Sequence, residues 1–256
     1  MLKKFYDKSE LTFSIIWIVA YCVLASIGDN LSDVLGISKV ITLPVLLVLS
    51  TVLFLFVKRN NLTEKYGFCK ANVAASKMLF YIPVIVLLTA NTWHGFRVNM
   101  FPFETILYIL SMLCVGFLEE VIFRGLLFNA MLPNGKNSAI VVSSVTFGIG
   151  HIINLFNGSG AELLPNLLQV VYAIAVGFMF VMIYYRTKSL LPCIIAHGVF
   201  NALSAFANET GLTSKEQIVS GVLITLISGA YAIYLGWFVR ISSHQIPICG
   251  WDNEKL

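Results

Sequence analysis

Long apolar stretches separated by short polar segments follow one another along almost the whole chain. Each stretch can be compared with the roughly 20 residues that an α-helix needs to cross a hydrocarbon layer of about 30 Å. The third stretch carries Pro83, which predicts a kink there. We expect an all-α fold, a polytopic membrane helix bundle with about eight transmembrane helices. The expected spans are residues 11–28, 39–57, 78–93, 104–130, 138–156, 165–185, 189–207 and 217–240.

The composition agrees with a lipid surrounding and excludes an ordinary soluble domain. Of the 256 residues, 58% are hydrophobic and only 12% are charged, with a mean hydropathy of +0.84. The chain has no internal repeat, low-complexity stretch or long linker, so we expect residues 1–256 to form a single membrane domain. The five cysteines form no CxxC pair, which argues against a disulfide framework and a thiolate metal site.

The placement of Lys and Arg predicts the orientation in the membrane, because short cytoplasmic loops are rich in both. With eight spans the two termini share a side, and thirteen basic residues fall on that side. Only Lys39, Arg97 and Lys215 fall on the other side. We therefore expect both termini, and the long loop 58–77, to be cytoplasmic. Since the basic residues are spread over several loops, they form no nucleic-acid-binding stripe, and no nucleic acid partner is expected.

Ionisable and polar side chains inside three of the spans require a reason, because charge in a membrane is costly. Glu120 and Arg124 are four residues apart, so they share a helix face and are expected to form an ion pair. Glu119 then lies on the next face without a local countercharge, in surroundings that suit a general base. The full set is Glu119, Glu120 and Arg124 in the fourth span, His151 at the end of the fifth, and His197 and Asn201 in the seventh.

The histidines are placed so that they could reach this carboxylate. His197 and Asn201 are one helical turn apart and face the same way. His151 follows Phe147 by one turn, and we expect the small residues Gly148 and Gly150 to let another helix approach closely. Counted at about 1.5 Å per residue from the predicted cytoplasmic ends, all three spans bring their polar groups to similar depths, between the cytoplasmic interface and the midplane.

Each of these residues also has an ordinary structural interpretation. A single buried histidine is more often a packing residue than a catalyst, the Glu120 and Arg124 pair is more often structural, and Phe147 fits a packing role. The combination carries the prediction, because two His, two Glu and an Asn occupy three spans at similar depth despite the cost in lipid.

At these positions the sequence resembles the CPBP (Abi) family, the CAAX prenyl protease and bacteriocin-processing membrane endopeptidases. Its three motifs occur in order, each in a separate span, between residues 119 and 201. The pattern EExxxR is similar to Glu119, Glu120 and Arg124, the pattern FxxxH to Phe147 and His151, and the pattern HxxxN to His197 and Asn201.

The resemblance implies an intramembrane endopeptidase with Glu119, His151, His197 and Asn201 as catalytic residues. Glu120, Arg124 and Phe147 would support them. Two mechanisms stay open. In one, a metalloendopeptidase, Zn²⁺ is held by His151 and His197 with oxygen ligands, and Glu119 takes a proton from bound water. In the other, Glu119 and His151 activate water directly, while His197 and Asn201 donate hydrogen bonds to the oxyanion.

The implied substrate is a membrane-associated or lipidated protein or peptide, whose prenylation the sequence leaves open. The short chain and compact loops favour a bacterial member in the plasma membrane. Two other functions use the same polar residues differently. A polytopic transporter would use them as a proton or ion relay, although no inverted repeat is visible. A non-enzymatic bacteriocin-immunity protein would share the fold and lack the chemistry.

Overall fold

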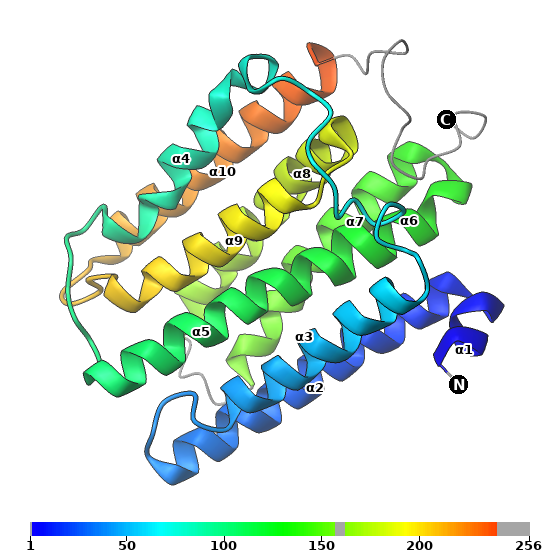
Figure 1. The fold of residues 1–256 in the computed structure, drawn as a ribbon. Helices are drawn as coiled ribbons and strands as arrows, with labels where there is room; N and C mark the ends of the chain where they lie inside the picture. The colour runs from blue at the N-terminus through cyan, green and yellow to red at the C-terminus, as the bar shows by residue number, and fades with distance from the viewer. Residues whose placement is uncertain (1, 157–161, 240–256) are drawn as a thin grey trace.

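A computed structural model describes residues 2–156 and 162–239 (Figure 1). Within these residues the chain is helical and forms no strand, apart from an isolated bridge between Phe96 and Ala207. The α-helices are α1 (Leu2–Lys8), α2 (Glu10–Leu35), α3 (Thr42–Arg59), α4 (Ile82–Leu88), α5 (Pro102–Glu119), α6 (Phe128–Met131), α7 (Lys136–Gly150), α8 (Leu163–Thr187), α9 (Leu191–Leu203) and α10 (Ser214–Trp237). The other helical segments are η1 (Ala75–Tyr81), η2 (Ala90–Thr92), η4 (Leu132–Asn134), η5 (His151–Leu155) and η6 (Ser204–Phe206), which are 3-10 helices, and η3 (Glu120–Leu127), which is a π-helix.

Seven helical stretches of the described chain are long and apolar enough to cross a membrane. They are Glu10–Leu35, Thr42–Arg59, Ala75–Thr92, Pro102–Asn134, Lys136–Leu155, Leu163–Thr187 and Ser214–Trp237. The remaining predicted span is present as a shorter apolar helix, Leu191–Phe206. The predicted all-α membrane bundle is confirmed, with seven long apolar stretches and one shorter apolar helix at the eight predicted spans.

The helices form a bundle in which the central members lie between two helical pairs (Figure 1). The pair α2 and α3 lies along one edge, and α4 and α10 lie along the opposite edge. Between them α5 packs against α9, and α7 packs against α8. The fourth, fifth and seventh predicted spans, which carry the candidate residues, therefore meet in the interior.

The kink predicted in the third span has a different origin from the one expected. Pro83 lies in the first turn of α4, where proline is well tolerated. The helix is instead broken just before it, where Leu79, Phe80 and Tyr81 have φ values of 49°, 49° and 57°. These left-handed conformations are unfavourable for residues with a side chain, so α4 is only seven residues long.

Glycines allow the central helices to come into backbone contact. A Cβ atom added to Gly116 of α5 would lie 2.5 Å from the Cα atom of Gly198 in α9. On the other side of the bundle, a Cβ added to Gly148 of α7 would lie 2.6 Å from the backbone nitrogen of Ile174 in α8. The prediction for Gly148 thus holds, but the one for Gly150 is wrong, because no atom lies within 4 Å of a Cβ added there.

The turn before the seventh predicted span is buried inside the protein. Ser189 and Leu190, just before α9, are fully buried. The preceding loop covers them: the backbone N–H of Leu190 donates to the carbonyl of Gly67, and the hydroxyl of Ser189 donates to the carbonyl of Cys69. Burial also lowers the pKa of the neighbouring Lys188 to about 7. The turn that precedes α9 is therefore packed beneath the loop that contains Gly67 and Cys69.

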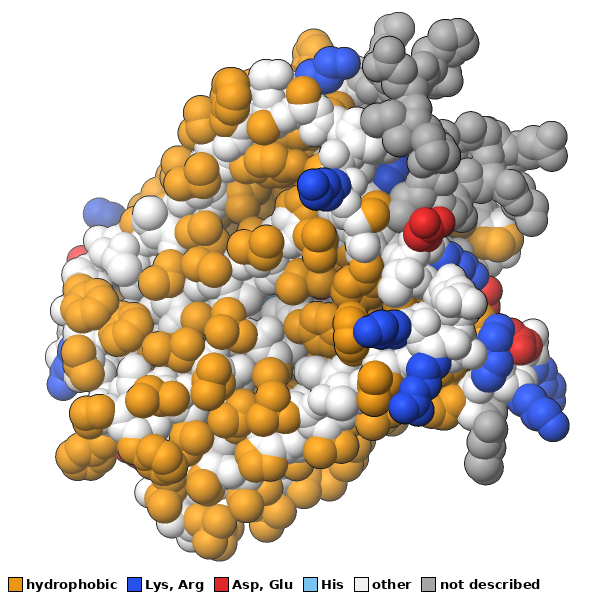
Figure 2. Space-filling model, viewed as in Figure 1, with side chains coloured by type: hydrophobic (Ala, Val, Ile, Leu, Met, Phe, Trp, Pro, Cys, Tyr) orange, Lys and Arg blue, Asp and Glu red, His pale blue; other side chains and the backbone are white. Residues whose placement is uncertain are grey.

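The surface shows a sharp separation of charged and apolar side chains. In Figure 2 most Lys and Arg side chains gather at the end of the bundle where the N-terminus lies, while apolar side chains cover the flank. Many large apolar side chains are exposed, among them Val34, Phe101 and Trp237 at 82%, 79% and 78%. Such a flank is unfavourable in water and matches a hydrocarbon layer, so the chain is an integral membrane protein.

The contact at Gly116 yields a prediction about stability. Gly116→Ala places its methyl group against the backbone of α9, which cannot move as a side chain could, and should lower the free energy of unfolding by about 1–3 kcal/mol. Gly229→Ala is the matched control, since no atom lies within 4 Å of its added Cβ and alanine favours the helix. Thermal unfolding in detergent measures both. Equal midpoints for the two variants would contradict the close approach of α5 and α9.

Candidate active site

The two adjacent glutamates lie where the α-helix α5 passes into the π-helix η3. A π-helix is wider than an α-helix and often occurs at functional sites. Side chains also donate hydrogen bonds to two backbone carbonyl groups of η3. The Ser143 hydroxyl donates to the Phe123 carbonyl at 2.8 Å, and the Asn129 amide donates to the Gly125 carbonyl at 2.6 Å. The regular helix assumed from the sequence is therefore interrupted at the residues that matter most.

Glu120 and Arg124 form an ion pair in the interior. The Arg124 guanidinium donates to Glu120 Oε1 at 2.9 Å, and neither side chain is exposed. The guanidinium also lies 4.1 Å from the centre of the Phe147 ring, a cation–π arrangement that stabilises a desolvated cation. Phe147 is thus a neighbour of the charged groups as well as a packing residue.

His197 lies between this ion pair and Glu119. Its Nδ1 lies 2.7 Å from Glu120 Oε1, and its Nε2 lies 3.4 Å from Glu119 Oε2. Because an ionised carboxylate only accepts hydrogen bonds, Nδ1 carries the proton. When Nε2 is protonated as well, two carboxylates and two cations balance, which suits a medium of low polarity. The sequence paired Glu120 with Arg124 and did not predict that the same oxygen would bind His197.

Glu119 has a partner that sequence reasoning missed. The Tyr21 hydroxyl of α2 donates to Glu119 Oε1 at 2.7 Å, across a sequence separation of 98 residues. Tyrosines of membrane helices concentrate at the interfaces, whereas Tyr21 lies about 17 Å along α2, counted at 1.5 Å per residue from its start. A buried tyrosine in the middle of a span is the signal that could have identified it.

His151 is held in one orientation at the start of η5, directly after α7 ends. Its Nδ1 lies 3.1 Å from the Phe147 carbonyl, which can only accept, so Nδ1 carries the proton. Nε2 is then a lone-pair acceptor, and no described residue donates to it. The Asn166 amide donates to the His151 carbonyl at 2.9 Å and fixes the backbone.

The ring of Phe147 lies between the two histidines. Its centre is 5.1 Å from the His151 ring and 5.6 Å from the His197 ring, and both contacts are edge-to-face. Together with the guanidinium of Arg124, the two imidazoles leave little room for Phe147 to change rotamer. Phe147 therefore sets the spacing between the two histidines.

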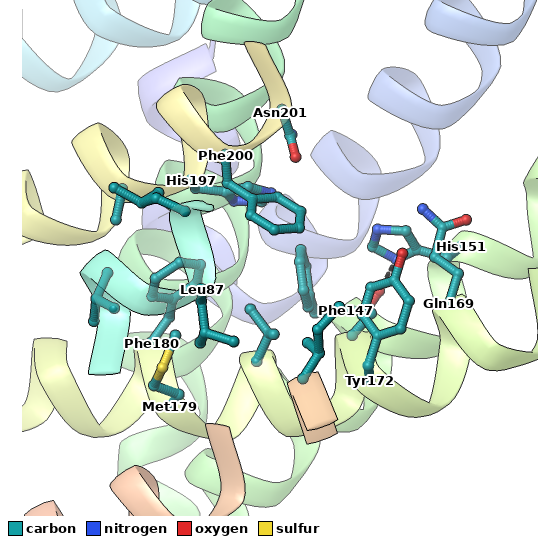
Figure 3. Close-up of a pocket in the computed structure, with 16 residues that line it drawn as sticks. Leu87, Phe147, His151, Gln169, Tyr172, Met179, Phe180, His197, Phe200 and Asn201 are labelled. Carbon is teal, nitrogen blue, oxygen red and sulfur yellow. Dashed lines mark hydrogen bonds between the residues drawn. The ribbon is translucent and has the colours of Figure 1, made fainter. Parts of the chain in front are cut away.

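A cavity opens on these residues between α4, α8, α9 and α10 (Figure 3). His151 lies on one side of it, while His197 and Asn201 lie on another (Figure 3). Glu119 is not among the lining residues and reaches the cavity only beside His197. The remaining wall is mostly apolar and includes Val84, Leu87, Leu88, Phe147, Tyr172, Ala173, Val176, Met179, Phe180, Ala196, Phe200 and Ile224, with Gln169 as a further polar group.

The described residues do not gather a set of metal ligands. No three His, Cys, Asp or Glu side chains in residues 2–156 and 162–239 are arranged so that they could hold a metal ion. His197 uses Nδ1 on Glu120, and His151 uses Nδ1 on a backbone carbonyl, which leaves one nitrogen on each ring. A catalytic zinc ion takes three protein ligands and a water molecule, and the described residues hold no third His, Cys, Asp or Glu side chain arranged with these two nitrogens.

Residues 101–203 match the family model of the type II CAAX prenyl endopeptidase Rce1-like family. This segment contains all three motifs and every candidate catalytic residue, so the family resemblance predicted from the sequence is confirmed. A search of curated proteins gave no match. At the level of the family, the match supports an intramembrane endopeptidase that acts on a peptide at the membrane.

The buried ion pair generates a prediction about folding. Arg124→Ala leaves Glu120 charged in the interior and should cost about 3–5 kcal/mol, enough to reduce the yield of folded protein sharply. Lys3→Ala is the matched control, because Lys3 and Asp7 form an ion pair with the same spacing on the surface. Surface pairs contribute about 0–1 kcal/mol, so this variant should unfold like the wild type. Similar yields and unfolding midpoints for both variants would contradict the structural role of Arg124.

Proposed function

We propose that this chain, with its Rce1-like segment 101–203, is an intramembrane endopeptidase in which Glu119 activates the attacking water. The observation that carries the proposal is the array in which His197 is hydrogen-bonded to Glu120, itself paired with Arg124, and lies 3.4 Å from Glu119. Structural packing alone gives no reason to bury two adjacent carboxylates beside two imidazoles and an apolar cavity.

The partners of each group suggest its part in hydrolysis. Glu119 Oε2 would take a proton from water, with His151 Nε2 as a second acceptor, and the water oxygen would attack the carbonyl carbon of the peptide bond. His197 Nε2–H and the Asn201 amide would donate to the resulting oxyanion. As the carbon–nitrogen bond breaks, the proton would pass from Glu119 to the leaving amine. These reaction steps conserve every atom and return Glu119 to its starting state.

Glu120 and Arg124 would act through His197. The hydrogen bond from Nδ1 to Glu120 orients the imidazole so that Nε2 points toward Glu119. The hydrogen bond from Arg124 to Glu120 keeps the Glu120 carboxylate in place. We therefore assign both to the support of the site.

We favour the route without zinc, because no three His, Cys, Asp or Glu side chains of the described residues are arranged to supply the three protein ligands of a catalytic zinc ion. The mechanism needs no ion to generate the nucleophile if Glu119 and His151 share that task. Activity of the wild-type protein after exhaustive chelation, with no bound metal by elemental analysis, is the expected result. Stoichiometric zinc that is lost in both His151→Ala and His197→Ala would instead establish a metalloendopeptidase.

The cavity suggests what kind of substrate the site takes. Its wall is apolar except for the reacting groups and Gln169, so it favours an extended peptide with apolar side chains over a charged one. The surrounding lipid would concentrate a substrate that is itself membrane-associated, such as a lipidated peptide.

We also propose that both termini are cytoplasmic and that the protein resides in a bacterial plasma membrane. The cluster of Lys and Arg at the N-terminal end of the bundle supports this orientation (Figure 2). A cysteine introduced at Lys70, in the long basic loop, should resist impermeant thiol reagents in intact cells. Labelling of this cysteine from outside the cell would contradict the proposed orientation.

The central test compares two glutamates of the same helix. Glu119→Gln removes the proposed base and should reduce cleavage of a fluorogenic lipidated peptide by about 10²- to 10⁴-fold. Glu104→Gln is the matched control: it lies in the first turn of α5, where its carboxylate accepts from the Ser38 backbone at 2.9 Å, and it should cleave like the wild type. Purified proteins in detergent are compared by initial rates.

The outcome distinguishes the proposed peptidase from the other functions. A wild-type protein that cleaves no peptide but moves protons or ions across vesicles would be a transporter. If Glu119→Gln cleaves the peptide at the wild-type rate, the protein is a peptidase but Glu119 is not its general base. Unfolding curves for both variants must match the wild type, which the nearly isosteric change to Gln makes possible.

A further inference from the structure

The bond between Tyr21 and Glu119 joins the proposed base to a helix outside the Rce1-like segment. Tyr21 belongs to α2, is 8% exposed, and lies far in sequence from residues 101–203. Its hydroxyl donates to Glu119 Oε1 at 2.7 Å, the usual length of a hydrogen bond from a hydroxyl group to a carboxylate. The three family motifs do not include this residue.

The two oxygens of the Glu119 carboxylate have different surroundings. Oε1 is held by Tyr21, whereas Oε2 faces His197 Nε2 at 3.4 Å. Charge-assisted hydrogen bonds between nitrogen and oxygen are usually about 2.7–2.9 Å long, so the contact of Oε2 with His197 is not a fully formed one. Oε2 is therefore the oxygen that retains capacity to bind a water molecule.

The terminal torsion of a glutamate side chain has no sharp preference by itself. Rotation about this bond between sp³ and sp² carbons is broad, so external contacts decide how the carboxylate is oriented. Tyr21 supplies that contact on Oε1. Without it the carboxylate could turn toward His197 and close the gap to a direct ion pair, in which Oε2 would no longer be available to water.

We infer that Tyr21 is a positioning residue of the active site, which holds Glu119 so that Oε2 serves as the base. This inference rests on the proposed peptidase function. Tyr21 does not line the cavity, so it should influence the chemical step and leave substrate binding unchanged. A merely structural tyrosine would change stability without changing the turnover of the folded enzyme.

The test is Tyr21→Phe, which deletes only the hydroxyl group. We expect kcat to fall about tenfold or more, the usual scale for loss of a hydrogen bond to a charged group, while KM stays at the wild-type value. Tyr231→Phe is the matched control, because its buried hydroxyl also joins two helical segments, donating to the Met78 carbonyl at 2.6 Å, and neither residue lines the cavity. The control should keep the wild-type kcat.

Double-variant measurements separate positioning from general damage. The midpoints of thermal unfolding of Tyr21→Phe, Glu119→Gln and the combined variant should be non-additive, because the first change already removes the bond. Additive midpoints, or a kcat for Tyr21→Phe equal to that of the wild type, would overturn the inference. A wild-type protein that cleaves nothing would overturn the peptidase function itself, so the two failures are distinguishable.

Discussion

A single carboxylate oxygen, Glu120 Oε1, joins the parts of the candidate site. It accepts from Arg124 within its own helix and from His197 of α9, at 2.9 and 2.7 Å. Removing one partner of a buried charged pair is strongly destabilising, so both donors must remain in place. The bundle meets this demand by bringing α5 and α9 into backbone contact at Gly116 and Gly198, one residue from His197. Helix packing and charge compensation therefore depend on each other.

The two neighbouring glutamates show how surroundings separate the roles of identical side chains. Glu120 is unexposed and accepts from both Arg124 and His197, which fixes its orientation. Glu119 has a tyrosine on one oxygen and a loosely placed imidazole on the other. One carboxylate thus resembles a structural counterion, and the other has an oxygen available for chemistry. The π-helix that begins between them changes the direction in which successive side chains project.

The sequence predicted the membrane bundle and the motif residues for physical reasons that are visible locally. Lipid requires long apolar helices, and it makes each charged group inside a span conspicuous, so Glu119, His151 and His197 could be identified one by one. Other features depend on contacts that no local pattern records. The loop that contains Cys69 covers Ser189 before α9, and the carbonyl partners of η3 came from Ser143 and Asn129. The contact of Tyr21 with Glu119 joins residues 98 positions apart.

The claim on which the account rests is that Glu119 acts on water and does not attack the substrate itself. A single turnover in water enriched in ¹⁸O tests this directly, with mass spectrometry of both the product and the enzyme peptide that contains Glu119. The account predicts one solvent oxygen in the new carboxylate of the product and none in Glu119. A product without solvent oxygen, together with label in the Glu119 carboxylate, would contradict it, because that pattern requires a covalent intermediate on the glutamate.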